Sequence, residues 1–373
     1  MNDNKQIKTK RVFGLDLMRA MAIIMVLSSH ILWIYNPEDG IIKQLFPLLG
    51  FLGVEFFFIL SGFLIGRIIY SIFIKDKFTL QSALSFLQRR WFRTLPLYFL
   101  VLIINIIITT SLNNPVSQLS LYFVFLQNGF SKMPYFFPES WSLSVEEWAY
   151  IVLPLSLLLF SSFFKPIDRN KFFLKVTLLL ILMFICFKIV YQMQAKTTSL
   201  QQWNVSLKSV MIYRLDAVFM GVLCAWISIN FKIFWAKFKF QSAFIGTVIM
   251  IFMYCGMGFF KILPHTYSFI WNVIYLPLTS LSIAFFIPFF SQLETNVNVI
   301  KKPIECLSKI SYSIYLLHYS VILQLLMLFF DKEKTSLIQL HFITIFYLAT
   351  TVVISYLFYR FYEKPMTDLR DIN

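Results

Sequence analysis

The sequence predicts an all-α polytopic membrane protein of about ten transmembrane helices, with both termini in the cytoplasm. The first observation is composition: of the 373 residues, 58% are hydrophobic and only 14% are charged. A soluble domain carries about 25% charged residues, so this chain is not a soluble globular protein. The second observation is that apolar runs of bilayer-spanning length, about 20 residues each, recur along the whole chain.

Ten spans are predicted from these runs, and a polar segment at 112–141 separates the third from the fourth. Within that segment, 119–127 is expected to form a short interfacial helix. The first run is too long for the core of a signal peptide and is expected to stay as a helix. The predicted spans are 14–35, 45–68, 90–110, 143–163, 173–192, 208–229, 241–260, 268–290, 310–330 and 340–361.

Basic residues set the predicted orientation. With the N-terminus inside, the inner segments carry 23 Lys and Arg residues and the outer segments carry 7. This asymmetry is the usual one for membrane proteins, and it explains the net charge of +15 without a nucleic-acid partner. We expect one membrane domain over 1–373, with cytoplasmic tails at 1–13 and 362–373 and no appended soluble domain.

The four cysteines lie at unpaired spacings, so the sequence indicates neither a disulfide framework nor a metal site. Ionisable residues inside the spans are better functional candidates, because a charge at the bilayer centre costs about 2.5–3.5 kcal/mol. Lys188, near an outer helix end, is instead expected to extend to the interface. The candidates are Asp16, Arg19, His30, Glu55, Glu146, Glu147, Arg214, Asp216 and His318.

The first span carries a basic residue and a histidine at a spacing that places both on one helical face. From Arg19 to His30 is eleven residues, or about 20° after whole turns, and about 16 Å along the axis. Asp16 can pair with Arg19 three residues away. The simpler interpretation is that Arg19 extends to the cytoplasmic interface and His30 only packs.

The second and third spans add a carboxylate and an arginine pair. Glu55 enters from the outer side, where it can orient His30, and Gly62 makes this helix thin enough for close contact. Arg90 and Arg93 share one face at the cytoplasmic end of the third span. Such a fork suits phosphate oxygens, although plain cytoplasmic anchoring is the alternative.

The fourth span opens with "WSLSVEEWAY", which combines Trp141, Glu146, Glu147 and Tyr150. At least one glutamate must face the bundle interior. Carboxylates bind sugar hydroxyls and aromatic rings cover sugar faces, so this stretch suits glycan handling. The alternative is an acidic pair at the outer boundary that is exposed to water.

Two later spans carry further polar groups. Arg214 lies in the outer half of the sixth span, where a structural ion network is as good an explanation as a substrate contact. In the ninth span, Ser311 and Tyr315 are one turn apart and His318 follows three residues later. This group either lines an inner cavity or makes hydrogen-bonded helix contacts.

Six stretches in order, from residue 15 to 365, resemble the type-3 membrane acyltransferases of bacteria. The resemblance implies a ten-helix core that moves an acyl group, usually acetyl, from cytoplasmic acyl-CoA to an extracytoplasmic glycan hydroxyl. In the stretch "SVEEW", Trp148 departs from the glutamine–aromatic continuation common in the family. The six stretches are "LDLMRAMAIIMVLSSH", "GVEFFFILSGFLI", "RRWFRTLPLY", "WSLSVEEWAY", "SYSIYLLHYS" and "YEKP".

The resemblance also implies roles for single residues. The family's basic-x10-His motif maps onto Arg19 and His30, with the histidine essential. Its RxxR motif maps onto Arg90 and Arg93, which implies donor binding, and its SxxxY motif maps onto Ser311 and Tyr315.

The resulting hypothesis is a membrane O-acyltransferase of the bacterial inner membrane that uses acyl-CoA, most simply acetyl-CoA, and needs no metal. His30 is either the general base or a transient acyl carrier. The rival hypotheses are a transporter or lipid-glycan flippase and a non-catalytic membrane sensor. The predicted catalytic residues are His30, Glu55 and Glu146; the predicted donor-binding residues are Arg19, Arg90, Arg93, Ser311 and Tyr315; the predicted acceptor-binding residues are Trp141, Glu147, Tyr150 and Arg214.

Overall fold

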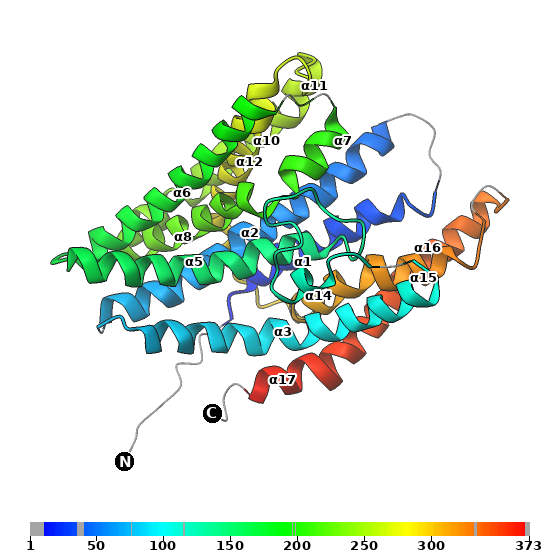
Figure 1. Cartoon of the computed structure of the whole chain (residues 1–373), viewed down its shortest axis with the longest axis horizontal. Helices are drawn as coiled ribbons and strands as arrows, with labels where there is room; N and C mark the ends of the chain where they lie inside the picture. Colours follow the sequence, from blue (N-terminus) through cyan, green and yellow to red (C-terminus); the bar gives the residue numbers. More distant parts are fainter. Residues whose placement is uncertain are drawn as a thin grey trace.

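A computed structural model of the chain is a bundle of helices (Figure 1). It describes residues 11–35, 41–75, 77–114, 116–195, 197, 199–331 and 334–369. Every regular element in these residues is helical, which confirms the predicted all-α class. Most of the predicted N-terminal tail and the last four residues lie outside the described residues, whereas 362–369 continues the last helix.

Within the described residues, nine helices are long and apolar enough to cross a membrane, and the apolar helix α8 (Leu215–Asn230) is shorter. Because α8 occupies the sixth predicted span, each of the ten spans corresponds to a helical segment. The bounds are α1 Phe13–Ile31, α2 Ile41–Lys75, α3 Leu80–Ser111, α5 Ser140–Phe164, α6 Arg169–Gln194, α8, α10 Lys239–Ile251 continued by η3 Phe252–Gly256 and α11 Met257–Phe259, η4 Ile270–Ile274 with α12 Tyr275–Ala284 and α13 Ile287–Phe290, α14 Asn298–Leu317 with η5 His318–Leu323 and α15 Gln324–Met327, and α16 Leu337–Phe358 with η6 Tyr359–Glu363 and α17 Lys364–Leu369.

Several helices begin earlier than the hydropathy predicts. Helix α3 starts at Leu80 rather than near 90, and α14 starts at Asn298 rather than near 310. The start of α3 is capped by Thr79, whose side chain accepts a hydrogen bond from the Ser82 backbone N–H at 3.2 Å. Hydropathy marks only the lipid-facing part of such a helix, so the polar first turns were not predicted.

Helices α2 and α8 cross at two glycines. A Cβ on Gly62 would lie 1.9 Å from the carbonyl oxygen of Val218, and a Cβ on Gly221 would lie 2.2 Å from that of Ile59. No side chain fits between the two backbones at this crossing. The expectation that Gly62 permits close helix contact is therefore confirmed.

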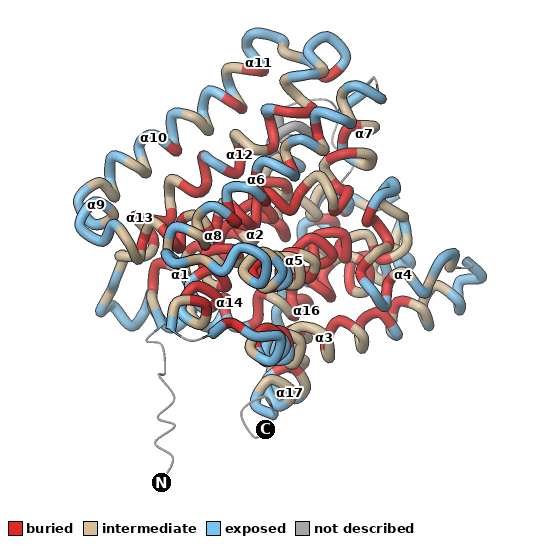
Figure 2. Tube along the Cα trace, turned by 60° about the vertical axis from the view of Figure 1, so that its left-hand side comes forward, coloured by how far each residue is buried: buried red, intermediate tan, exposed pale blue. Residues whose placement is uncertain are grey.

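Burial divides the bundle into central and peripheral helices (Figure 2). In the most apolar window of Leu45–Lys75, 67% of residues are buried inside the protein, whereas only 17% are buried in that of Leu337–Leu369. The peripheral helices expose large apolar side chains, which is the pattern of surfaces in contact with lipid. The exposed residues include Phe240, Phe244, Phe252, Phe342 and Ile345.

The polar segment between α3 and α5 is ordered over its described residues. It contains the five-residue helix α4 (Leu119–Phe123), within the stretch where a short helix was predicted. The Asn128 amide then donates to the carbonyl oxygens of Trp141 at 3.1 Å and Ser209 at 2.8 Å. These bonds fix the segment against the start of α5, which carries the acidic pair.

Candidate active site

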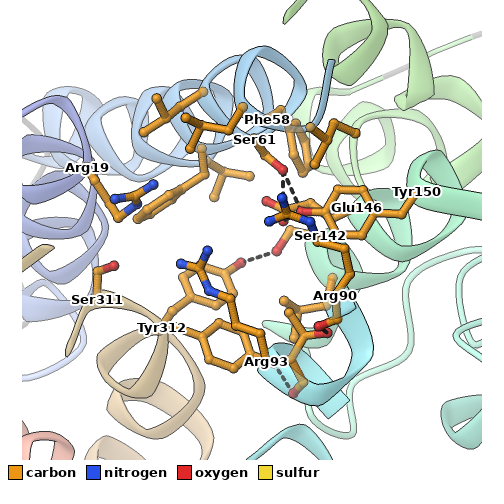
Figure 3. Close-up of a pocket in the computed structure, with 18 residues that line it drawn as sticks. Arg19, Phe58, Ser61, Arg90, Arg93, Ser142, Glu146, Tyr150, Ser311 and Tyr312 are labelled. Atoms are coloured by element: carbon orange, nitrogen blue, oxygen red, sulfur yellow. Dashed lines mark hydrogen bonds between the residues drawn. The ribbon is translucent and has the colours of Figure 1, made fainter. Parts of the chain in front are cut away.

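A cavity of about 100 Å³ lies between helices α1, α2, α3, α5 and α14 (Figure 3). Its wall combines apolar side chains, mostly from α2, with charged and hydroxyl side chains from all five helices. The polar lining residues are Arg19, Ser61, Arg90, Arg93, Thr94, Ser142, Glu146, Tyr150, Ser311, Tyr312 and Tyr315.

Three guanidinium groups point into the cavity from two helices (Figure 3). Arg90 and Arg93 come from α3, and Arg19 comes from α1. Arg19 also donates to the hydroxyl of Ser308 on α14 at 3.0 Å. The structure thus brings together the three arginines that the sequence predicts as donor-binding, although Arg19 lies far from Arg90 and Arg93 along the chain.

The predicted pairing of Asp16 with Arg19 is present but is not the closest contact of Asp16. Its carboxylate accepts from Arg11 at 2.6 Å and from Ser308 at 2.6 Å, whereas Arg19 lies at 3.5 Å. Arg11 and Ser308 therefore make the shortest hydrogen bonds to the Asp16 carboxylate and stabilise its negative charge. The Arg19 guanidinium remains directed at the cavity.

The acidic pair of α5 points into the protein in two directions. Glu146 lines the cavity and accepts from the Tyr150 hydroxyl at 2.6 Å and from Ser61 at 3.3 Å. Glu147 is 3% exposed and accepts from the Thr94 hydroxyl at 2.7 Å. An acidic pair exposed to water at the outer boundary is therefore excluded.

Ser311 and Tyr315 both line the cavity, as the inner-cavity alternative predicted. The Tyr315 hydroxyl lies 2.6 Å from the Ser142 hydroxyl and donates to the carbonyl oxygen of Glu139 at 3.1 Å. These contacts hold the tyrosine ring across one end of the cavity.

His30 lies in the last turn of α1 and contacts a second histidine. Its Nδ1 atom is 3.3 Å from Nε2 of His318 and 2.9 Å from the carbonyl oxygen of Val26. Arg19 and His30 thus contact the same helical segment: Arg19 contacts Ser308 in α14, and His30 contacts His318, the first residue after α14. The predicted common face of α1 is confirmed.

The cavity does not reach His30, which is not among its lining residues. The ring of Tyr315 lies 5.9 Å from that of His318, and Tyr315 itself lines the cavity. Tyr315 therefore adjoins both the arginine cavity and the histidine pair.

The expectation that Glu55 orients His30 is wrong. Glu55 forms an ion pair with Arg214 and accepts from Ser280 at 2.9 Å. Among the described residues, neither Glu55 nor Glu146 contacts His30. A fully buried carboxylate needs a buried cation, and Arg214 supplies it, so the network alternative holds for Arg214.

The remaining predicted residues lie outside the cavity wall. Arg214 stands over the Phe58 ring at 5.6 Å, and Phe58 lines the cavity. Trp141 is 8% exposed, and its ring contacts Phe58 at 5.8 Å. The prediction that Lys188 extends to the interface is wrong. Its side chain is fully buried and donates a hydrogen bond to Asp216 at 2.5 Å.

Three polar residues near the site were missed or left without a role. The ammonium group of Lys208 stands 5.6 Å over the Trp141 ring. Burial raises the pKa of Glu139, which accepts from Ser320, to about 7. His318 was a candidate without a partner. Glu139 precedes the predicted fourth span, in a segment predicted to be polar, so hydropathy gave no sign of its burial.

The chain also places Trp148 against the polar segment, where its indole donates to the carbonyl oxygen of Phe125 at 3.1 Å. Trp148 of the "SVEEW" stretch thus links α5 to the polar segment. Among the described residues, no cluster of three His, Cys, Asp or Glu side chains could hold a metal ion.

Fold and site together define a polytopic α-helical membrane protein with a polar, arginine-rich cavity inside its helical bundle. Comparison with protein families identifies the class more closely. The model of the type-3 acyltransferase family, described as "Acyltransferase domain", matches residues 12–360. The chain therefore belongs to that family, which confirms the resemblance found in the sequence.

Three named proteins show the similarity at the level of sequence. The O-acetyltransferase OatA of Staphylococcus aureus (strain NCTC 8325 / PS 47) is 23% identical over 95% of this chain and 57% of its own length. The peptidoglycan O-acetyltransferase OatA of Listeria monocytogenes is 28% identical over 45% of this chain and 27% of its own length. The putative peptidoglycan O-acetyltransferase YrhL of Bacillus subtilis (strain 168) is 29% identical over 39% of this chain and 23% of its own length.

The chain thus matches less than two thirds of the length of any of these relatives. No solved structure matches it.

Proposed function

We propose that the protein is an O-acetyltransferase of the bacterial inner membrane that transfers acetyl from acetyl-CoA to a hydroxyl of a cell-surface glycan. The observation that carries the proposal is the cavity in which three arginines from two helices converge within the bundle. The relatives named as O-acetyltransferases of peptidoglycan support the reaction type and a cell-wall glycan as acceptor.

The cavity suits the anionic part of the donor rather than the whole molecule. Arg19, Arg90 and Arg93 present planar donors that match phosphate oxygens. The volume of about 100 Å³ holds one phosphate-sized group, whereas pockets for drug-sized ligands measure roughly 300–1,000 Å³. The donor would therefore place a phosphate among the arginines and require side chains to move before its arm passes towards His30.

Transfer forms one ester bond and breaks one thioester bond. The acceptor hydroxyl loses its proton to His30, its oxygen attacks the acyl carbon, and the CoA thiolate leaves and takes up a proton. In the alternative route, His30 first attacks the acyl carbon itself and then passes the acyl group to the hydroxyl. Tyr315 lines the cavity and neighbours His318, so in this proposal its ring shifts to admit the thioester.

A transporter of lipid-linked glycans is the second candidate, because a multi-span helical bundle with buried charges also fits transport. A transporter needs no polyphosphate donor, so the two proposals differ in donor binding. Acetyl-CoA should raise the unfolding temperature of the purified protein if the cavity binds the donor. No shift with acetyl-CoA, together with glycan-dependent protection, would favour transport.

The central test replaces His30 and follows O-acetylation of surface glycans by mass spectrometry. We expect His30→Ala to lower transfer by about 10²–10⁴-fold, the usual contribution of a general acid–base group. His265→Ala is the matched control, because His265 is exposed and lies outside the cavity wall and the histidine pair. If the His30→Ala variant is present at a normal membrane level and O-acetylation persists, the mechanism is refuted. If O-acetylation is lost, a non-catalytic sensor is excluded.

A second measurement separates the two roles of His30. Labelled acetyl-CoA is added without acceptor, and the protein is digested and examined for acetyl-histidine. Label on His30 identifies an acyl carrier, whereas rapid transfer on later addition of acceptor without prior label identifies a general base.

A further inference from the structure

Two histidines from distant parts of the chain meet at the outer end of α1. His30 Nδ1 lies 3.3 Å from His318 Nε2, and the two rings meet edge to face with centroids 4.7 Å apart. No acidic side chain among the described residues is hydrogen-bonded to His30. Its described hydrogen bonds go only to Val26, Ser29 and His318. The usual orienting carboxylate of a catalytic histidine is therefore absent from the described part of the chain.

Backbone carbonyls fix which nitrogen of each ring carries a hydrogen. A carbonyl oxygen only accepts, so the Nδ1 atom of His318, 2.8 Å from Tyr315 O and 3.1 Å from Ile314 O, is a donor. In the neutral ring, Nε2 of His318 then carries a lone pair. By the same argument, Nδ1 of His30, 2.9 Å from Val26 O, is a donor, and its hydrogen is shared with His318 Nε2.

We infer that His318 is a positioning residue for His30: together with Val26 O it accepts the Nδ1 hydrogen of His30, fixes the direction of the ring and so keeps the lone pair on His30 Nε2. This inference rests on the proposed role of His30 and deepens it. The same atom serves both open routes, since Nε2 either takes the proton of the acceptor hydroxyl or attacks the acyl carbon.

The surroundings hold His318 more firmly than His30. His318 is fully buried and begins the π-helical turn η5, directly after the last α-helical residue of α14. Such turns are frequent at functional sites. The next residue, Tyr319, places its ring 4.7 Å from that of His30, so one helical turn contacts the imidazole by both hydrogen bonding and ring packing.

When His30 acts as a base and becomes positively charged, its Nδ1–H already has hydrogen-bond acceptors. When Nε2 takes a proton, the Nδ1 hydrogen remains directed at His318 Nε2 and Val26 O. Both atoms carry lone pairs, and hydrogen bonds to charged donors are about twice as strong as neutral ones. His318 thus orients His30 as a carboxylate orients other catalytic histidines, but it supplies no opposite charge.

The test compares two replacements of His318 in the purified, full-length protein with acetyl-CoA and a soluble glycan acceptor. His318→Phe keeps a flat ring and removes the acceptor, whereas His318→Gln keeps an oxygen that can accept from His30. We expect kcat to fall by about 10–100-fold in the Phe variant, the range for lost outer partners of a reactive group. The Gln variant should recover most of that loss, and KM for acetyl-CoA should stay unchanged in both, because His318 does not line the arginine cavity.

Nitrogen NMR of ¹⁵N-histidine-labelled protein gives an independent reading, which is practicable because the chain has four histidines. In the wild-type protein, His30 should show a protonated Nδ1 and an unprotonated Nε2. Wild-type kcat in the Phe variant, equal losses in both variants, or a protonated Nε2 on His30 would each overturn the inference. If a variant does not fold, the wild-type spectrum still decides through the nitrogen–nitrogen scalar coupling across the hydrogen bond from His30 Nδ1 to His318 Nε2, which a bond to Val26 O alone cannot produce. An active His30→Ala variant would instead refute the proposed function, and the NMR result would still report on the histidine pair.

Discussion

Arg90 and Arg93 concentrate positive charge in a cavity that Glu146 also lines, and Glu146 is already hydrogen-bonded to Tyr150 and Ser61. An entering anion would relieve the repulsion among the guanidinium groups. Replacing Arg90 and Arg93 together by Ala should therefore weaken donor binding by at least tenfold, or about 1.4 kcal/mol. The measurement is the acetyl-CoA-induced rise in unfolding temperature across a concentration series.

Arg89→Ala is the matched control for this prediction, since Arg89 neighbours the pair on α3 but does not line the cavity. Its acetyl-CoA response should equal that of the wild type. Equal donor affinity in the double variant would return Arg90 and Arg93 to the role of cytoplasmic anchors.

The ion pair of Glu55 and Arg214 should stabilise the fold without touching the chemistry. Both side chains are buried, so removing one partner leaves an uncompensated charge, at a cost of about 3–5 kcal/mol. Arg214→Leu should lower the unfolding temperature strongly, and Glu55→Leu combined with Arg214→Leu should recover part of the loss. Lys334→Ala, which breaks an exposed pair with Asp331, should change nothing measurable. A wild-type melting curve for Arg214→Leu would contradict this assignment.

Single residues were predicted from the sequence where helical geometry alone decides their place. The common face of Arg19 and His30 follows from their spacing and is confirmed. The partner of Glu55 could not be predicted, because Arg214 lies far along the chain, directly before α8, and only packing determines which buried charges meet. His318 was named as a candidate, but its contact with His30 depends on the same packing.

At the scale of elements, the crossing of α2 and α8 is the contact most sensitive to side-chain size. A Cβ on Gly62 would fall 1.9 Å from the backbone oxygen of Val218, so the helices must separate to admit it. Overpacking of this kind costs about 1–3 kcal/mol. Gly62→Ala should therefore lower both the yield of folded protein and its unfolding temperature.

Gly258 offers the control for this crossing, since a Cβ there meets nothing within 4 Å. Gly258→Ala should be neutral or slightly stabilising, because alanine favours helix over glycine. If Gly62→Ala behaved in the same way, the α2–α8 crossing would be wider than described.

Elements were predicted well where they face lipid and poorly where they do not. Hydropathy located the ten spans but missed the polar first turns of α3 and α14. It also gave no sign of the π-helical turn at His318, because a π turn has the composition of an ordinary helix. The segment before α5 was predicted as polar, yet its Asn128 is buried, because hydrogen bonds to Trp141 and Ser209 replace those to water.

At the scale of the whole molecule, ten crossings would return the chain to the side on which it starts. Arg11, just before α1, interacts electrostatically with Glu305 of α14 and Tyr359 of η6, so the first and last spans end together. The distribution of basic residues predicts that this side is the cytoplasm. A fluorescent protein fused after residue 373 should therefore be fluorescent, and alkaline phosphatase fused there should be inactive. Phosphatase fused at Lys334, one crossing earlier, should be active; the reverse pattern would invert the membrane orientation and place the arginine cavity out of reach of cytoplasmic acetyl-CoA.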